Sequence, residues 1–244
     1  MFNDFNIDKK TLYIIVTIFV IYLVYRYFTN TNSILWLLYS LPGLLIAITF
    51  HEFAHAKTAD ILGDDTPRIE GRLTLNPLVH MDPIGCIMLL FAGFGWGKPV
   101  HVNPRNYNRT ISMEKADAIV SIAGPITNFV LAIIFMIIYF LIHKYAKNIQ
   151  STAFSVTSNM INRFIVINVG LGVFNLIPLP PLDGSKVIKP FLPYDAKQWF
   201  ESNEHIFYII FIVLWITGIA GTIISPVVNW VDQGIYNLVS LIIR

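Results

Sequence analysis

Charged residues are scarce in this chain. Only 13% of its 244 residues are Asp, Glu, Lys or Arg, whereas 55% are hydrophobic. A water-soluble domain carries about 25% charged residues, so the scarcity argues against that class. The one cysteine, Cys86, excludes a disulfide within the chain and is expected to be a small packing residue. The net charge of +2, with no dense basic cluster, gives no indication of nucleic-acid binding.

The chain contains several long apolar segments without a charged residue. Most of the charge-free segments reach the roughly 20 residues that a helix needs to cross a bilayer. These segments are Thr11–Tyr25, Tyr27–Phe50, Ala118–Ile142, Phe164–Leu182 and Ile206–Val231. They predict an integral membrane protein of the all-α class, a bundle of five or six transmembrane helices that forms a single domain over residues 1–244.

The expected helices follow these runs. They cover residues 11–28, 33–60, 114–143, 155–177 and 205–225, and the tail 226–244 either crosses the membrane as a sixth helix or lies in the interface. The glycine-rich stretch "CIMLLFAGFGWGKPVHVNP" (86–104) is too short for an ordinary spanning helix. It is expected to form a re-entrant hairpin or short strands beside a cavity, where irregular backbone is tolerated at membrane depth.

The distribution of Lys and Arg predicts the orientation. A cytoplasmic N-terminus places 12 of the 17 basic residues on the cytoplasmic side, as the positive-inside rule favours. The helix over 33–60 then runs inward, so that its last third lies in the membrane near the cytoplasmic face. We therefore expect a multi-pass protein of the cell membrane with its active site near that face.

That last third contains "HEFAH", with His51, Glu52 and His55. Residues four apart share a helix face, so both imidazoles can point at one zinc ion while the glutamate takes a proton from a water molecule. This is the H-E-x-x-H arrangement of zinc hydrolases. A charged side chain in the middle of a spanning helix costs about 2.5–3.5 kcal/mol, which favours a functional role over a hydrogen-bonded structural trio.

A third zinc ligand is required, and two residues are candidates. Glu70 is one, but it lies in a hydrophilic loop. Asp183, in "VFNLIPLPPLDGSKV", is favoured because Pro178, Pro180 and Pro181 end an apolar run just before it. Gly184 then permits a tight backbone around the carboxylate. A solvated aspartate in a cytoplasmic turn is the alternative.

The motifs HEFAH, "NPLVHMDPIG", "AGPITNFVLA" and "NLIPLPPLDG", in this order, resemble the site-2 protease family of intramembrane zinc metalloproteases. The resemblance covers about residues 40–190 and is closest to the compact bacterial type without a PDZ domain, with a catalytic core over about 33–190. It implies that His51, His55 and Asp183 bind one zinc ion per chain and that Glu52 is the catalytic base.

Three asparagines are further candidates for roles at or near the zinc site. Asn128, in AGPITN, either positions substrate and stabilises the oxyanion or forms an interhelical hydrogen bond. Asn168 and Asn175 are seven residues apart and share a helix face, which predicts a polar seam toward the zinc. Asn168 is expected to be structural, whereas Asn175 belongs to the family's motif and is expected to bind substrate.

Two further features are less decisive. His80 is a rival metal ligand, although a proline-flanked loop histidine is more often a structural hydrogen-bonding residue. The stretch "FGWGKPVHV" is strand-like, and Gly97, Val100 and Val102 are expected to bind an extended substrate by edge pairing.

The sequence thus predicts an intramembrane zinc endopeptidase that cleaves transmembrane protein substrates. Its expected partners are the lipid bilayer and membrane proteins with a transmembrane helix, while a regulatory protein or a second copy is left open. The alternatives are a membrane metal-ion transporter with a His/His/Asp transit site, in which Glu52 would have no use, and a catalytically silent relative.

Overall fold

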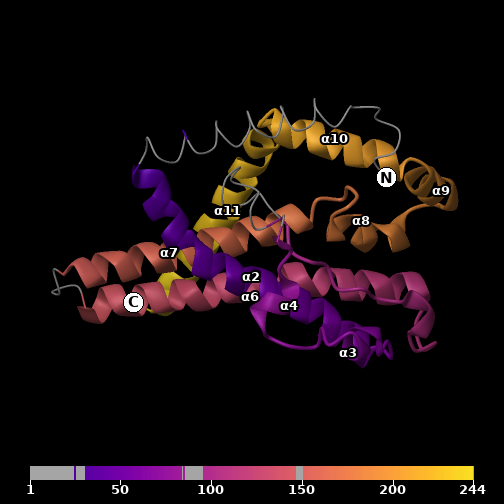
Figure 1. The fold of residues 1–244 in the computed structure, drawn as a ribbon, viewed down its shortest axis with the longest axis horizontal. Helices are drawn as coiled ribbons and strands as arrows, with labels where there is room; N and C mark the ends of the chain where they lie inside the picture. The colour runs from indigo at the N-terminus through magenta and orange to yellow at the C-terminus, as the bar shows by residue number, and fades with distance from the viewer. Residues whose placement is uncertain (1–24, 26–30, 84, 86–95, 147–150, 244) are drawn as a thin grey trace. The chain divides into compact units, whose positions relative to one another are not determined.

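The computed structural model describes residues 25, 31–83, 85, 96–146 and 151–243 (Figure 1). Its contacts divide the chain into two units, residues 1–38 with 81–97 and residues 39–80 with 98–244. The helix expected over 11–28 lies outside the described residues, apart from Tyr25. Most of the expected re-entrant stretch, residues 86–95, lies outside them as well. A single metalloprotease domain stays a prediction.

The described part is helical, as the all-α class predicts. The elements, in order, are α2 (Thr31–Ile61), α3 (Thr66–Ile69), α4 (Pro77–His80), η1 (Pro104–Asn106), α6 (Met113–Ala146), α7 (Thr152–Asn175), α8 (Asp183–Ile188), η2 (Lys189–Phe191), α9 (Tyr194–Ser202), α10 (Glu204–Ile216) and α11 (Ile219–Ile242). In the described residues the one β feature is an isolated antiparallel bridge between Met81 and Gly97 in the first unit.

Two helices in the described part are long and apolar enough to cross a membrane, Leu37–Ile61 and Met113–Ala146. The segments Glu204–Trp215 and Ile219–Ile242 qualify as a third span only if the bent pair is taken as one. These observations agree with a polytopic helical membrane protein.

The expected helix over 205–225 is wrong in its boundaries, because the chain bends by 82° between α10 and α11. Gly218, at the bend, has a φ of 75°, a left-handed conformation that glycine adopts readily. The tail from residue 226 to 242 continues α11 and does not form a separate helix.

The core of the second unit lies where α6, α7 and α11 meet. In Figure 1, α6 and α7 run side by side, and α7 is the helix that α6 contacts most extensively. The cluster's buried side chains come from α6 (Ala132, Met136), α7 (Ile161, Ile165, Val169, Val173) and α11 (Ile235, Val239). A smaller cluster of Ala59, Tyr107, Ala116 and Val120 joins the end of α2 to the start of α6.

Local sequence sets the ends of α7. Ser151 caps its start by accepting a hydrogen bond from the Phe154 N–H at 3.1 Å. The helix ends at Asn175, and the prolines at 178, 180 and 181 keep the chain from continuing as a helix. The turn that follows carries the chain to Leu182 and Asp183, where α8 begins.

Candidate metal centre

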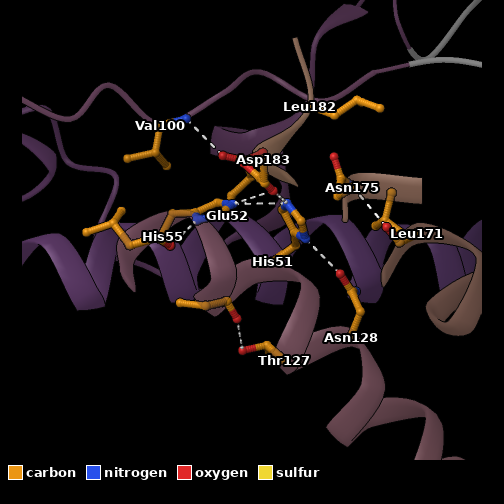
Figure 2. A network of polar contacts seen from close by, with 12 residues as sticks. His51, Glu52, His55, Val100, Thr127, Asn128, Leu171, Asn175, Leu182 and Asp183 are labelled. Carbon is orange, nitrogen blue, oxygen red and sulfur yellow. Dashed lines mark hydrogen bonds and ion pairs between the residues drawn. The ribbon is translucent and has the colours of Figure 1, made fainter. Parts of the chain in front are cut away.

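His51 and His55 lie one turn apart on α2 and face the same point (Figure 2). Both side chains are buried, with 5% and 8% of their surface exposed. Their Nε2 atoms are 3.0 Å apart. The i, i+4 spacing in the sequence therefore brings together two nitrogens that could bind a metal ion, as expected.

Asp183 completes the group from the start of α8. Its Oδ2 atom lies 3.1 Å from the Nε2 of His51 and 3.2 Å from the Nε2 of His55. The next residue, Gly184, allows the chain to pass this close to the end of α7. A Cβ at Gly184 would lie 2.3 Å from the Leu176 carbonyl oxygen and 2.5 Å from that of Ile177. The start of α8 can thus pack against the end of α7, which brings the carboxylate to the histidines.

The second nitrogen of each imidazole is held by a hydrogen bond. His55 Nδ1 lies 2.7 Å from the carbonyl oxygen of Val120, which can only accept, so Nδ1 carries the proton. His51 Nδ1 lies 2.7 Å from the side-chain oxygen of Asn128. The Asn128 amide nitrogen faces the Ala47 carbonyl at 3.1 Å, which fixes the amide orientation and makes His51 Nδ1 the donor. Both Nε2 atoms are consequently unprotonated acceptors.

Three acceptors therefore converge on one point, and this arrangement needs a cation. The Oδ2 of Asp183 is buried and has no hydrogen-bond donor among the residues that the structure describes, since the two nitrogens beside it carry no proton. The donor atoms of His51, His55 and Asp183 all lie within 4.8 Å of one another. Two imidazoles and a carboxylate are typical protein ligands of catalytic zinc, so the residues present fit that ion.

Gly124 on α6 makes room for the imidazoles. A Cβ at this position would lie 2.5 Å from His55 Nε2 and 2.7 Å from His51 Cε1. Real Cβ atoms essentially never approach other atoms so closely. The glycine of AGPITN thus lets α6 pass directly over the candidate site, a role that the sequence analysis did not assign.

Glu52 lies between the two histidines in sequence and is half-buried. Its Oε2 atom accepts a hydrogen bond of 2.8 Å from the backbone N–H of Val100 (Figure 2). No other hydrogen bond to its carboxylate is found among the described residues. One carboxylate oxygen is held, and the other is left for a proton.

The predicted polar seam combined Asn168 with Asn175, but the residue that Asn168 pairs with in the structure is Asn128. Asn128 donates to the Asn168 side-chain oxygen at 3.0 Å, and Asn168 donates to the Phe164 carbonyl at 2.8 Å. Both hydrogens of the Asn128 amide are therefore engaged, one by Ala47 and one by Asn168. Asn175 donates to the Leu171 carbonyl at 3.1 Å (Figure 2).

The rival ligands are not part of the group. His80 is fully buried, and its Nε2 lies 2.8 Å from the Thr74 carbonyl oxygen, a structural contact. Glu70 is exposed, and its carboxylate lies 3.2 Å from His101 Nδ1. Neither residue belongs to the set of His, Asp and Glu side chains that could hold a metal ion in the described part of the chain.

The segments expected to bind substrate have different surroundings. Gly97 forms the β-bridge with Met81, and the Val100 N–H is occupied by Glu52. Val102 packs partly buried against the small cluster at the end of α2. Its backbone groups have no hydrogen-bond partner among the residues that the structure describes.

Sequence reasoning did not identify two buried charged residues near the site. Arg72 is 3% exposed and Asp64 is fully buried. Both lie in the hydrophilic stretch after α2, where the sequence alone indicates solvent exposure. Only their tertiary contacts distinguish them from the charged residues around them.

Comparisons with known proteins agree with this site. The family model described as peptidase family M50 matches residues 39–218. A Bacillus subtilis (strain 168) protein named "Putative zinc metalloprotease YwhC" is 37% identical over 84% of this chain and 93% of its own length. "Putative zinc metalloprotease Rip2" of Mycolicibacterium smegmatis is 30% identical over 78% of this chain and 71% of its own. No solved structure matches the chain.

The predicted resemblance to the site-2 protease family is thereby confirmed. The match includes the HEFAH segment of α2 and the Asp183 turn, which together form the candidate site. It gives no support to a metal-ion transporter. The chain belongs to peptidase family M50.

Proposed function

We propose that this protein is an intramembrane zinc endopeptidase that cleaves transmembrane protein substrates. One observation supports the proposal above all: the carboxylate oxygen of Asp183, from α8, meets two unprotonated imidazole nitrogens of α2, a helix that is apolar enough to cross a membrane. The carboxylate of Glu52 lies on the next residue of the same helix. Hydrolysis requires such a base, whereas a transit site for metal ions does not.

His51, His55 and Asp183 would hold the zinc ion, one per chain. Bound zinc would lower the pKa of a coordinated water toward about 7 and polarise the scissile carbonyl. Glu52 takes the proton from the attacking water and returns it to the leaving amine. Its hydrogen bond from the Val100 N–H keeps the carboxylate in place for both transfers.

Asn128 acts through His51 in this proposal. Because both of its amide hydrogens are engaged, it has none to offer an oxyanion. Its oxygen holds the Nδ1 proton of His51, which directs the lone pair of Nε2 to the metal. Asn168 supports this orientation from α7. Asn128 is therefore a positioning residue, and the interhelical hydrogen bond is how it works.

Substrate would be bound beside this site in an extended form. The backbone of Val102 has no hydrogen-bond partner among the described residues, so it can pair with an unwound substrate segment. The Val100 N–H can pair only if it leaves Glu52. Asn175 donates one amide hydrogen to Leu171, and its oxygen and second hydrogen, which have no partner among the described residues, would be available for substrate. Gly97 remains a further candidate for substrate binding.

The Lys and Arg distribution favours a cytoplasmic N-terminus and a site near the cytoplasmic face of the cell membrane. The substrates would then be membrane proteins whose transmembrane helix is cut near that face. A helical peptide bond is shielded by its own turn, so we expect substrates with helix-weakening residues near the cut.

The test uses purified protein reconstituted in liposomes with a panel of single-span substrates. The wild type is expected to hold one zinc ion and to cleave, while Glu52→Gln holds the same zinc and does not cleave. Zinc-loaded wild type that cleaves no substrate, together with zinc flux that survives Glu52→Gln, would overturn the proposal and favour transport.

A further inference from the structure

Arg72 is a buried cation that has no carboxylate partner in the described part of the chain. Its side chain is 3% exposed, and it forms no ion pair with any residue that the structure describes. A buried charge is costly unless hydrogen bonds satisfy it. Three backbone carbonyls do so here: those of Val79, Pro99 at 3.0 Å and, more weakly, Lys98 at 3.5 Å.

These carbonyls belong to two segments that are far apart in sequence. One is the polar stretch that ends in α4, and the other is the segment from Lys98 to Val100, which has no regular secondary structure. The Lys98 N–H also donates to the His80 carbonyl at 2.8 Å. Arg72 therefore joins the segment Lys98–Val100 to the polar stretch that precedes it.

The peptide unit between Pro99 and Val100 connects Arg72 to the candidate base. Its carbonyl oxygen accepts from the Arg72 guanidinium, and its N–H donates to Glu52 Oε2 at 2.8 Å. A peptide unit is planar, and in its trans form the oxygen and the hydrogen point in opposite directions. The hydrogen bond from Arg72 to the Pro99 carbonyl thus sets the direction of the Val100 N–H. Because this peptide unit is hydrogen-bonded at both ends, the two bonds also strengthen each other.

We propose that Arg72 is a positioning residue for proteolysis: by binding the Pro99 carbonyl it aims the Val100 N–H at Glu52. This inference rests on the proposed function. Glu52 is held at one oxygen by a backbone donor that cannot rotate freely. The guanidinium acts on Glu52 through one peptide unit, and its hydrogen bonds in the described part of the chain go to backbone carbonyls alone.

Arg72→Met, Arg72→Lys and Arg68→Met are compared with the wild type as full-length, zinc-loaded protein. Arg68 is the matched control, since it is exposed and pairs with Asp60. We expect Arg72→Met to keep its zinc, to lose about 10- to 100-fold in kcat through misplacement of the base, and to change KM little. Arg72→Lys, which keeps a donor, should recover part of the loss, and Arg68→Met should match the wild type.

Val100→Pro removes the N–H itself and gives a second, independent variant. Because both changes break one chain of hydrogen bonds, Arg72→Met should add little to the kcat loss of Val100→Pro. Hydrogen exchange of peptides covering 98–103 should quicken in Arg72→Met, with zinc content unchanged. Unchanged kcat in Arg72→Met, or losses that simply multiply in the double variant, would overturn the inference. A wild type that holds zinc but cuts nothing would instead overturn the proposed function.

Discussion

The Nε2 atoms of His51 and His55 lie 3.0 Å apart, and both face the Oδ2 of Asp183. Because each imidazole carries its proton on Nδ1 and donates a hydrogen bond from it, the two Nε2 atoms and the Oδ2 are all acceptors. Such a group is mutually repulsive until a cation lies among them. Metal binding and folding of the second unit should therefore be coupled.

Removal of zinc is expected to destabilise the protein. A strong chelator should lower the thermal unfolding temperature of the wild type in detergent, and added zinc should restore it, because a ligand that binds only the folded state stabilises it. Asp183→Ala, which lacks one ligand, should respond much less to either treatment. An equal response of both proteins would show that the zinc effect does not arise at this site.

Asn128→Ala should weaken zinc binding about 10- to 100-fold, since it removes the group that orients His51. Asn128→Asp retains an oxygen that accepts the Nδ1 proton and should bind zinc more tightly than the alanine variant. Competition with a chromophoric chelator measures the affinities. If Asn128→Ala kept wild-type affinity and lost only kcat, the oxyanion role would be the better account.

Gly124→Ala should abolish most zinc binding, because the added methyl group would lie 2.5 Å from His55 Nε2. Gly170→Ala on α7 is the matched control, since a Cβ there meets nothing within 4 Å. Metal analysis after purification distinguishes the two proteins. Equal zinc content in both would mean that α6 can shift away from α2 without disturbing the site.

Asp64 should contribute stability that depends on pH. Burial alone would raise the pKa of its carboxyl, but hydrogen bonds from Thr66, Asn103 and Asn106 outweigh burial and hold the pKa below its usual range. A group with a lowered folded pKa stabilises fully above its unfolded pKa, about 3.9, and loses this contribution as the pH falls through the folded pKa.

Asp64→Ala is therefore expected to lower stability by about 1–3 kcal/mol at neutral pH, because it leaves buried donors unsatisfied. The difference in unfolding temperature from the wild type should stay constant down to about pH 5 and narrow below about pH 4. Asp65→Ala is the control, since Asp65 is exposed and its side chain does not cap α3. A difference that widens in acid would contradict the account.

The sequence predicted the parts of the site that depend on local periodicity. The helix expected over 33–60 is observed as Thr31–Ile61, and its i, i+4 histidines meet as expected. Asp183 could be predicted as a ligand because prolines and a glycine mark the end of the apolar run before it. These signals lie within a few residues of the side chain concerned.

Contacts between segments that are distant in sequence could not be predicted from such local signals. The Val120 carbonyl that orients His55 is a backbone group, and because every residue has one, the residue type gives no indication of this role. Arg72 reads as one more charge in a polar stretch, and its burial follows from carbonyls more than 20 residues away. The bend after α10 was missed because the apolar run continues unbroken through Gly218.

The most direct test of the metal centre is X-ray absorption at the zinc edge of the purified wild type. We expect one zinc ion per chain with the scattering pattern of two imidazoles, the remaining ligands being oxygen. His51→Ala should reduce the imidazole contribution to one. Sulfur scattering from Cys86, or an imidazole contribution unchanged in His51→Ala, would contradict the site described here.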